Sequence, residues 1–461
     1  MSKTKIHFVA LGQGLLLALA LAGCQSAPER QVSMRLAVFS ADVTPPLGHP
    51  LFACVAAKSI ADPLFARGFV LGEGSEAMVI VAVDWCEIRN DAHDRWREVL
   101  AEAAGTTPGR VMVTSVHQHD APMADLEAER ILQDRGAGVQ LINLGYHERM
   151  VQKTAESLRA GLKNAVCVTH FGMGRAKVER IASNRRFVEP DGRIHFGRGS
   201  NGGGNPAYRA FPDGEIDPWL RTLSFWSEDQ PVAALMSYAT HPMSYYGGGE
   251  VSSDFVGLAR ARWQKAHPDV HAVYASGCAG DVTAGKYNDG SPANRVRLTD
   301  RLAKAMDSAW ADTRRLPLTQ ADWRPVPLRL EARMGDGFKP EELERKLTAP
   351  GSSPFERVQA ALGLSWHKRV KAGHVLDVPV LDLGSVRVVL MPGETFVGYS
   401  LQAQKLQPDL FLMMLGYGEC APGYVPTEQT TSEGFNGSHD WLWVRPSAHR
   451  PMTQAVEAAL K

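Results

Sequence analysis

Features that the sequence lacks exclude several classes of protein. Lys and Arg number 50, and so do Asp and Glu, so no excess of positive charge suggests a nucleic-acid partner. None of the six cysteines forms a C-x-x-C pair, so a structural zinc knot is not expected. No G-x-S-x-G sequence is present, so a serine hydrolase with a nucleophile elbow is not expected either.

Long apolar runs are also scarce, and the main one lies at the N-terminus. FVALGQGLLLALALAG follows Lys3 and Lys5 and is too short and glycine-interrupted for a convincing membrane span. It ends in LAGC, which resembles a bacterial lipobox with Cys24 as the lipidated residue. We therefore predict a lipoprotein signal at 1–23 and a polar tether at 24–35. Gln25 at the sorting position implies the outer membrane by the same resemblance. An ordinary secretory signal is the alternative.

The rest of the chain, 36–461, has an α/β pattern. Strands are expected at 77–88, 109–116, 166–179 and 271–281, and helices at 90–105, 146–165, 254–267 and 294–312. Hairpins are expected at 221–242 and 374–394. The hairpins favour mixed β-sheets flanked by α-helices in a single large domain. No internal repeat is apparent.

One stretch, FGRGSNGGGNP at 196–206, is unusually rich in glycine. It lacks the strand-to-helix context of a dinucleotide site, so we predict a loop. Flexible loops often cover binding sites, and this loop is a candidate for such a cover.

Two histidines, His117 and His119, follow a predicted strand in VTSVHQHDAP. If the strand continues, its alternation places both side chains on the same face. Imidazole is a common metal ligand, so two histidines that converge on one point indicate a possible metal site. Two satisfied histidines at a strand end are the alternative. His241 also ends an apolar strand, in YATHPMSYY, and is either a ligand or a structural residue.

Two further positions have little meaning alone. Glu394 follows an apolar strand in RVVLMPGETF and is either a ligand or an acidic residue at a helix start. Tyr424 lies among turn residues in APGYVPTEQ.

The order of the motifs is more specific than any one of them. FSADVTPPLGHPL, VTSVHQHDAP, ASNRR, ATHPMSYY, SSDFVG, GCAGDVTAG, MPGETF and GYVPTEQ occur in the order of the neutral ceramidase family. The resemblance covers roughly Ser40 to Asn436. It implies a zinc amidase with the ligands His117, His241, Glu394 and Tyr424. His119 and Arg185 are implied to bind the carbonyl oxygen, and Thr283 stands where the family has a serine of assigned importance.

The sequence also departs from the family pattern. HTHSGP is HQHDAP here, which places Asp120 beside the site, and a family tyrosine falls near Phe435 and Asn436. The family's C-terminal β-sandwich is expected to be absent. We therefore expect a Zn²⁺-dependent hydrolase of an N-acyl amide in ceramide or a related lipid, with the membrane reached through Cys24. The alternatives are a metal hydrolase of another ester, lactone or peptide-like amide, and a non-catalytic binding lipoprotein.

Overall fold

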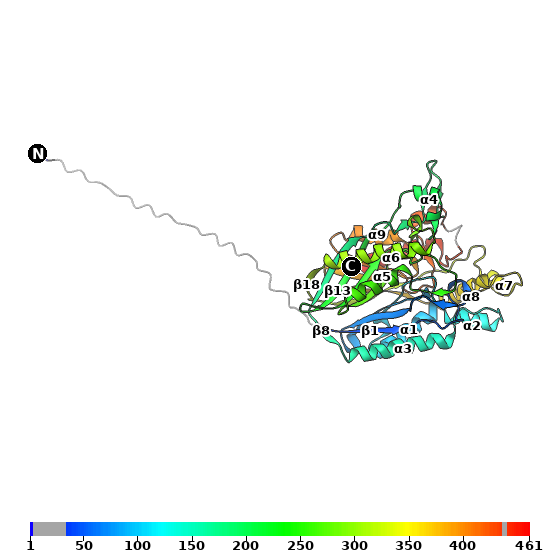
Figure 1. Ribbon diagram of the computed structural model, residues 1–461, viewed down its shortest axis with the longest axis horizontal. Coiled ribbons are helices and arrows are strands. Elements are labelled where there is room, and N and C mark those ends of the chain that lie inside the picture. Colours follow the sequence, from blue (N-terminus) through cyan, green and yellow to red (C-terminus); the bar gives the residue numbers. More distant parts are fainter. Residues whose placement is uncertain (3–33, 436–439) are drawn as a thin grey trace. The chain divides into compact units, whose positions relative to one another are not determined.

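Three mixed sheets contain most of the strands of the protein (Figure 1). The structure is a computed structural model that describes residues 1–2, 34–435 and 440–461. The predicted leader from residue 3 onward, Cys24 and nearly all of the tether lie outside these residues. From Met34 onward the described residues form one compact unit. Among them, no helix has the length and apolar character needed to cross a bilayer.

The strand order is β6-β4-β3-β1-β8 in the first sheet, β16-β14-β13-β9-β18 in the second and β19-β20-β21-β23 in the third. The strands of the first sheet are β1 (Met34–Asp42), β3 (Phe65–Leu71), β4 (Met78–Val83), β6 (Val111–Ser115) and β8 (Val166–Val168). Those of the second are β9 (His170–Lys177), β13 (Trp219–Ser227), β14 (Gln230–Tyr238), β16 (His271–Ser276) and β18 (Arg314–Pro317). Those of the third are β19 (Asp322–Leu328), β20 (Leu376–Asp382), β21 (Val386–Leu390) and β23 (Phe411–Leu415).

Short two-stranded pairs and helices complete the fold. The pairs are β2 (Ser59–Ile60) with β15 (Glu250–Val251), β5 (Glu87–Ile88) with β7 (Met123–Ala124), β10 (Ser183–Asn184) with β17 (Val282–Thr283), β11 (Phe187–Val188) with β12 (Ile194–His195), and β22 (Glu394–Thr395) with β24 (Tyr424–Val425). The helices are α1 (Asn90–Ala104), α2 (Leu126–Asp134), α3 (Leu144–Leu162), α4 (Pro206–Ala210), α5 (Asp254–Ala266), α6 (Pro292–Ala311), α7 (Pro340–Thr348), α8 (Pro354–Lys371), α9 (Val397–Leu406), α10 (Glu428–Ser432) and α12 (His449–Leu460).

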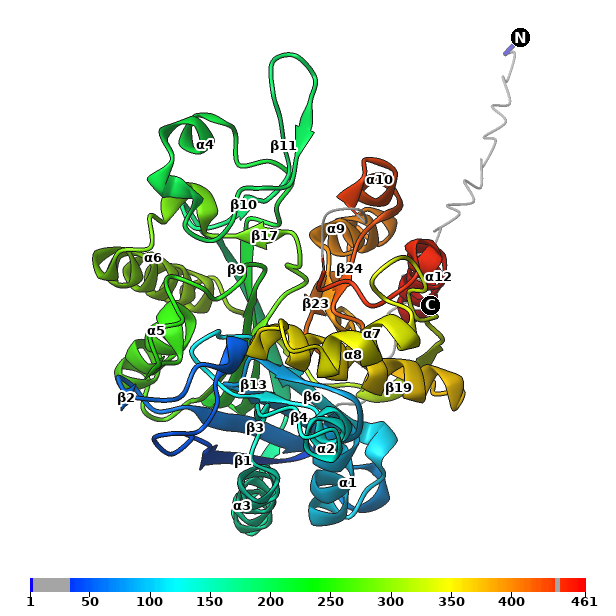
Figure 2. The ribbon, with the colours of Figure 1, turned by 90° about the vertical axis from the view of Figure 1, so that its right-hand side faces the viewer.

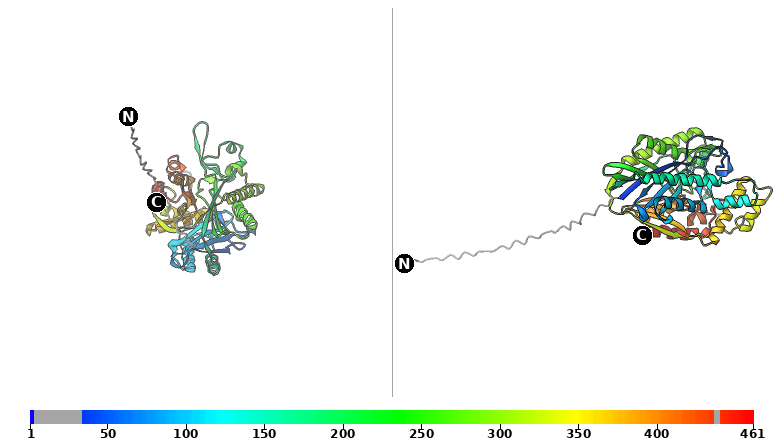
Figure 3. Two further views of the ribbon diagram at one scale, coloured as in Figure 1. Left: turned by 90° about the vertical axis from the view of Figure 1, so that its left-hand side faces the viewer. Right: turned by 90° about the horizontal axis from the view of Figure 1, so that it is seen from below.

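Each large sheet contains one parallel pair joined by a helix, and its other neighbours are antiparallel. The units are β4-α1-β6, β14-α5-β16 and β21-α9-β23. The carboxyl ends of two parallel strands lie at the same edge of a sheet, and ligand sites are built there. The edges meet: Ser115 N donates to Tyr417 O at 2.9 Å, and Gly416 N donates to Ser276 O at 3.0 Å. The left view of Figure 3 shows the blue and cyan segments of the first sheet, the green segments of the second and the orange segments of the third around this centre. The sequence did not reveal this threefold repetition.

Side-chain alternation explains how the layers are held together. Along β4, Val79 and Val81 belong to the core shared with α1 and α3, whereas Ile80 belongs to the core shared with the second sheet. Phe69 and Phe225, from the first and second sheets, pack with ring centroids 5.4 Å apart. Figures 1 and 2 show α1 and α3 on the outside of the first sheet and α5 and α6 beside the second.

The predicted mixed α/β class is confirmed, and both expected hairpins are present, turning between Ser227 and Gln230 and between Asp382 and Val386. Some local details are wrong. The helix expected at 254–267 begins with Asp254, a residue type that favours the N-cap, but Asp254 is the first residue of α5 rather than its cap, and its carboxylate accepts the Ser244 backbone N–H at 2.9 Å. The strand expected at 77–88 ends at Val83 and resumes only at Glu87. Helix α8, which borders the site, was not predicted.

Candidate active site

His117 follows β6 and is fixed by its backbone surroundings. Its Nδ1 lies 2.8 Å from the carbonyl oxygen of Cys86. A carbonyl only accepts hydrogen bonds, so Nδ1 carries the proton and Nε2 carries a lone pair. This buried Nε2 faces Oε2 of Glu394 at 3.4 Å, so any proton on the nitrogen is shared with that carboxylate. An imidazole held in this way is prepared to bind a cation through Nε2.

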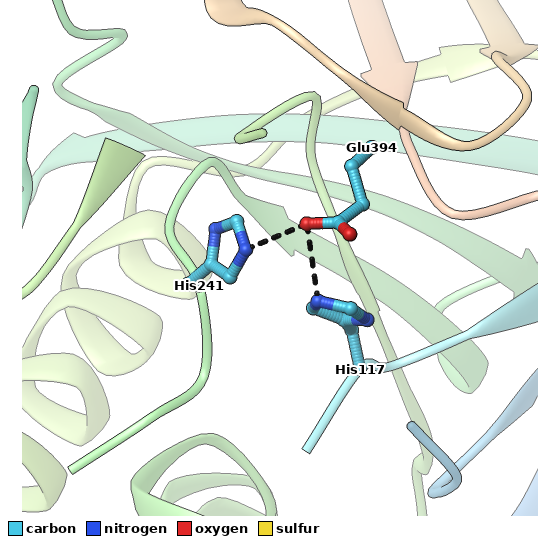
Figure 4. Close-up of side chains that lie close together, drawn as sticks. All are labelled: His117, His241 and Glu394. Carbon is cyan, nitrogen blue, oxygen red and sulfur yellow. Dashed lines mark hydrogen bonds and ion pairs between the residues drawn. The ribbon is translucent and has the colours of Figure 1, made fainter. Parts of the chain in front are cut away.

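His241 follows β14 and is held in the same tautomer. Its Nδ1 lies 2.7 Å from the carbonyl oxygen of Ala279, and its side chain is fully buried. Glu394, which follows β21, has Oε2 at 2.9 Å from Nε2 of His241 and at 3.4 Å from Nε2 of His117. Figure 4 shows the carboxylate between the two rings. The three ends of β6, β14 and β21 thus supply one cluster.

The cluster brings together atoms that repel each other unless a cation is present. Two nitrogen lone pairs and a carboxylate oxygen face one another within 4.8 Å. Buried acceptors without a donor are strongly destabilising, so a proton or a metal ion must be shared among them. Two imidazoles and a carboxylate form a donor set that suits zinc. The residues therefore fit a metal ion.

The pKa values follow from this crowding. Burial acts to raise the pKa of Glu394, but the charges and hydrogen bonds of His117 and His241 outweigh it and hold that pKa well below its ordinary value. Burial lowers the pKa of His241 to about 4, with a further contribution from the charge on Arg185. His241 is therefore neutral at neutral pH and offers a lone pair.

Tyr424 is placed beside Glu394 by strand register, because the two residues are partners in the parallel β22–β24 pair. Burial raises the pKa of Tyr424, and its hydrogen bond to Glu394 acts in the same direction. The fourth residue of the expected ligand set therefore lies at the cluster. A different tyrosine, Tyr417, was missed: its ring stacks on His117 at a centroid distance of 4.3 Å and an angle of 20°.

His119 and Arg185 lie next to the cluster, and both line the cavity into which the cluster opens. Nδ1 of His119 is 3.1 Å from the carbonyl oxygen of His117, so its Nε2 is the atom free to accept a proton. Burial and the neighbouring His117 hold the pKa of His119 well below its ordinary value. Nη2 of Arg185 lies 3.2 Å from the Tyr424 hydroxyl.

Thr283 and Asp120 do not join the described wall of this cavity. The Thr283 hydroxyl accepts the Gly285 N–H at 3.0 Å and stabilises a turn behind the site. Asp120 accepts the Gly247 N–H at 2.9 Å and lies 3.5 Å from Arg295. Both residues therefore support loops around the site.

The cavity itself measures about 300 Å³ and has an aromatic wall that the sequence did not reveal. Phe52 is central: its ring centroid lies 4.5 Å from that of His119, 5.7 Å from Phe355 and 5.9 Å from Trp441. Tyr246 also lines the cavity, with its ring 4.9 Å from His119. Gly199, Ser200 and Asn201 of the glycine-rich loop form another part of the wall, so the loop lies where a cover was expected.

A second group of possible ligands is already satisfied. His93, Asp94 and Glu419 have suitably close atoms. However, Glu419 is 3.2 Å from His374 and 3.4 Å from Arg369. A buried carboxylate paired with an arginine is best explained as an ion-pair network, which makes this group a weaker metal candidate.

The fold has solved counterparts, although the sequence matches no family model and no curated protein is significantly similar to it. Neutral ceramidase from Pseudomonas aeruginosa superposes with a TM-score of 0.65 over 94% of this chain and 74% of its own, at 16% identity. The chain has the fold of neutral ceramidase. A ceramidase complexed with C2 superposes with a TM-score of 0.63, over 93% of this chain and 75% of its own, at 17% identity. The expected neutral ceramidase fold is thus confirmed.

Proposed function

We propose that the chain is a zinc-dependent amidase that hydrolyses an N-acyl amide bond of a lipid, with ceramide as one candidate substrate. The observation that carries this proposal is the convergence of two Nε2 lone pairs and a carboxylate on one point at the base of an aromatic cavity. The ceramidase named in the similar structures is an amide hydrolase, which favours this class of reaction.

The proposed metal is Zn²⁺, held by His117, His241, Glu394 and Tyr424. When bound there, zinc would act as a Lewis acid toward the amide carbonyl and the attacking water. The backbone carbonyls of Cys86 and Ala279 fix the two imidazoles, a form of support that typically changes metal affinity 10- to 100-fold.

The neighbouring side chains then have separate tasks. The Arg185 guanidinium would donate to the carbonyl oxygen as negative charge develops there. The resemblance implies that His119 binds the carbonyl oxygen, but with Nδ1 donating to the His117 carbonyl its Nε2 bears a lone pair. We therefore assign His119 the role of a base, which would accept a proton from the attacking water and return it to the leaving amine. Phe52, Phe355 and Trp441 would bind the apolar acyl chain and exclude water.

The first experiment measures bound zinc by mass spectrometry. We expect about one ion per chain in the wild type, and much less in H117A, H241A and E394Q. H119A is the matched control, because it should retain zinc while kcat falls about 10²- to 10⁴-fold. H93N tests the second group of possible ligands. Loss of zinc in H93N with retention in H117A would show that the zinc binds at the second group instead. Loss of zinc in H119A would show that His119 is a ligand.

The second experiment identifies the substrate class. Zinc-loaded protein is tested on a panel of lipid N-acyl amides that includes ceramide, and the released fatty acid is measured. Hydrolysis of at least one member, abolished in E394Q, is the expected result. If no lipid amide is cleaved but a soluble lactone or peptide is, the proposed lipid amidase would be replaced by a metal hydrolase of that other substrate class. A protein that cleaves nothing in either panel would contradict the enzymatic proposal.

We also propose that the mature protein is anchored to the outer membrane through lipidated Cys24. The LAGC sequence after a basic and apolar leader supports this proposal. Such an anchor would keep the site near lipid substrates and raise their effective concentration.

A further inference from the structure

A second cavity, of about 440 Å³, lies apart from the aromatic one and is strongly basic. It is bordered by α6, by the turn at 285–288 and by the segment from the glycine-rich loop into α4, which Figure 2 shows near α6. Its charged lining consists of five cations and one carboxylate: Arg180, Arg209, Lys286, Arg297, Arg301 and Asp289. Tyr287, Asn288 and Asn294 add polar side chains to the wall.

Most of these cations have no carboxylate partner. Lys286 lies 3.0 Å from Asp213, but among the described residues the four arginines of the cavity make no ion pair. Arg301 donates to the carbonyl oxygen of Arg180 at 2.7 Å, and Arg297 donates to the side-chain oxygen of Asn294 at 2.8 Å. These two guanidinium groups therefore hydrogen-bond to neutral oxygens, which leave their positive charge unneutralised.

The arginines are also close enough to affect one another. Burial lowers the pKa of Arg301, and the charges of Arg180 and Arg297 lower it further. The single carboxylate, Asp289, is already engaged by the Ser291 N–H at 2.9 Å and by the Asn294 amide. Like charges gathered in one hollow raise the local positive potential and attract an anion.

The donors match a phosphate group better than a single carboxylate. Phosphate carries three or four acceptor oxygens, and guanidinium forks bind it through paired charge-assisted hydrogen bonds. We propose that this basic cavity is a phosphate-binding site, with the phosphate supplied either as the free ion or by a lipid head group.

The site would contact the back of the loop that borders the candidate active site. A Cβ on Gly203 would lie 2.7 Å from Asn288 O and 2.9 Å from Lys286 O, so the loop rests directly on the 285–288 turn. The Asn288 amide donates to Ser200 O at 2.8 Å, and Ser200 lines the aromatic cavity. A phosphate held by Lys286 would thus be linked to the proposed amidase cavity through the 285–288 turn and Ser200.

The test compares two probes on the purified full chain by calorimetry at constant ionic strength. One probe is inorganic phosphate, and the other is dihexanoylphosphatidylglycerol below its micelle concentration. Dihexanoylphosphatidylcholine is the zwitterionic control. The variant is R209Q/R297Q, because both residues are exposed. R135Q/R315Q is the matched control, which removes two exposed arginines that do not line the cavity.

Saturable binding of phosphate that R209Q/R297Q weakens about tenfold or more, with R135Q/R315Q unchanged, supports the site and free phosphate as its source. The same pattern with the phosphatidylglycerol probe alone supports a lipid head group. The proposal is overturned if neither probe binds saturably, if the two double variants weaken binding equally, or if R209Q/R297Q keeps wild-type affinity. The last result would place phosphate elsewhere, for instance at the metal cluster. None of these outcomes depends on amidase activity.

Discussion

The buried pair Asp84–Arg260 links the stability of the fold to the proposed zinc site. Both nitrogens of the Arg260 guanidinium donate to the Asp84 carboxylate, at 2.7 and 2.6 Å, and the two side chains are 5% and 0% exposed. Asp84 also accepts the Phe65 N–H at 2.9 Å and the Gln118 amide at 3.2 Å. Gln118 lies between His117 and His119, so the pair holds the loop that carries them.

The perturbation is R260L, which leaves the Asp84 carboxylate buried with only two neutral donors. Breaking a buried pair by removing one partner costs about 3–5 kcal/mol. Domains are typically stable by about 5–15 kcal/mol, so R260L should lose a large part of the free energy of unfolding. The double variant D84N/R260L removes the isolated charge, and the asparagine can still accept one hydrogen bond. We expect it to recover about half of the loss.

The assay is guanidinium unfolding followed by circular dichroism and tryptophan fluorescence, with coincident transitions required before free energies are compared. Zinc affinity is measured on the same variants, and loosening of the Gln118 contact should weaken it about 10-fold or more. A loss below about 1 kcal/mol in R260L, or a double variant no more stable than the single one, would refute the reasoning.

Two other predictions follow from burial and from the leader. Burial lowers the pKa of His147 to about 4, so the unfolded chain binds its proton first and stability falls as the pH drops below about 6.5. Between pH 7.5 and 5.5 this single residue should cost about 1 kcal/mol, and H147Q should show a correspondingly smaller difference between the two pH values; an equal difference in both proteins would contradict this assignment. C24A should release the protein from the outer membrane or leave it unprocessed, as seen by fractionation and mass, and full retention of C24A there would show that another tether exists.

The residues of the candidate metal cluster occupy comparable places in the sequence, although each local pattern alone left a structural alternative open. His117, His241 and Glu394 each follow an apolar strand, and strand ends of α/β sheets commonly carry sites. Motif order then grouped them, and the structure brings them together. The aromatic wall could not be predicted in this way. Phe52, Phe355 and Trp441 come from three distant segments, and nothing in the sequence near any of them indicates the others.

Some local predictions failed because tertiary contacts override local preference. Asp254 is a good N-cap residue in isolation, but its carboxylate also lies 3.5 Å from Arg295 and accepts the Ser244 N–H. Its backbone adopts φ = 50°, which is uncommon for a residue other than glycine. The side chain therefore joins the loop at Ser244 to the first turn of the helix, where it accepts the Phe255 N–H at 2.5 Å, an arrangement that no short window of sequence specifies.

The backbone at the cluster suggests why the site is built where the three sheets meet. His117 and Tyr417 both have left-handed backbones, with φ of 78° and 58°, and such conformations cost on the order of 1–3 kcal/mol each. The His117 N–H donates to Trp85 O at 2.9 Å, and the Tyr417 N–H donates to Gly393 O at 3.0 Å, so the loops that follow β4 and β21 hold both residues in place. In this strained arrangement Nε2 of His117 faces Glu394. A variant such as Y417A should therefore release His117 to a relaxed backbone and weaken metal binding, even though Tyr417 itself is not one of the proposed ligands.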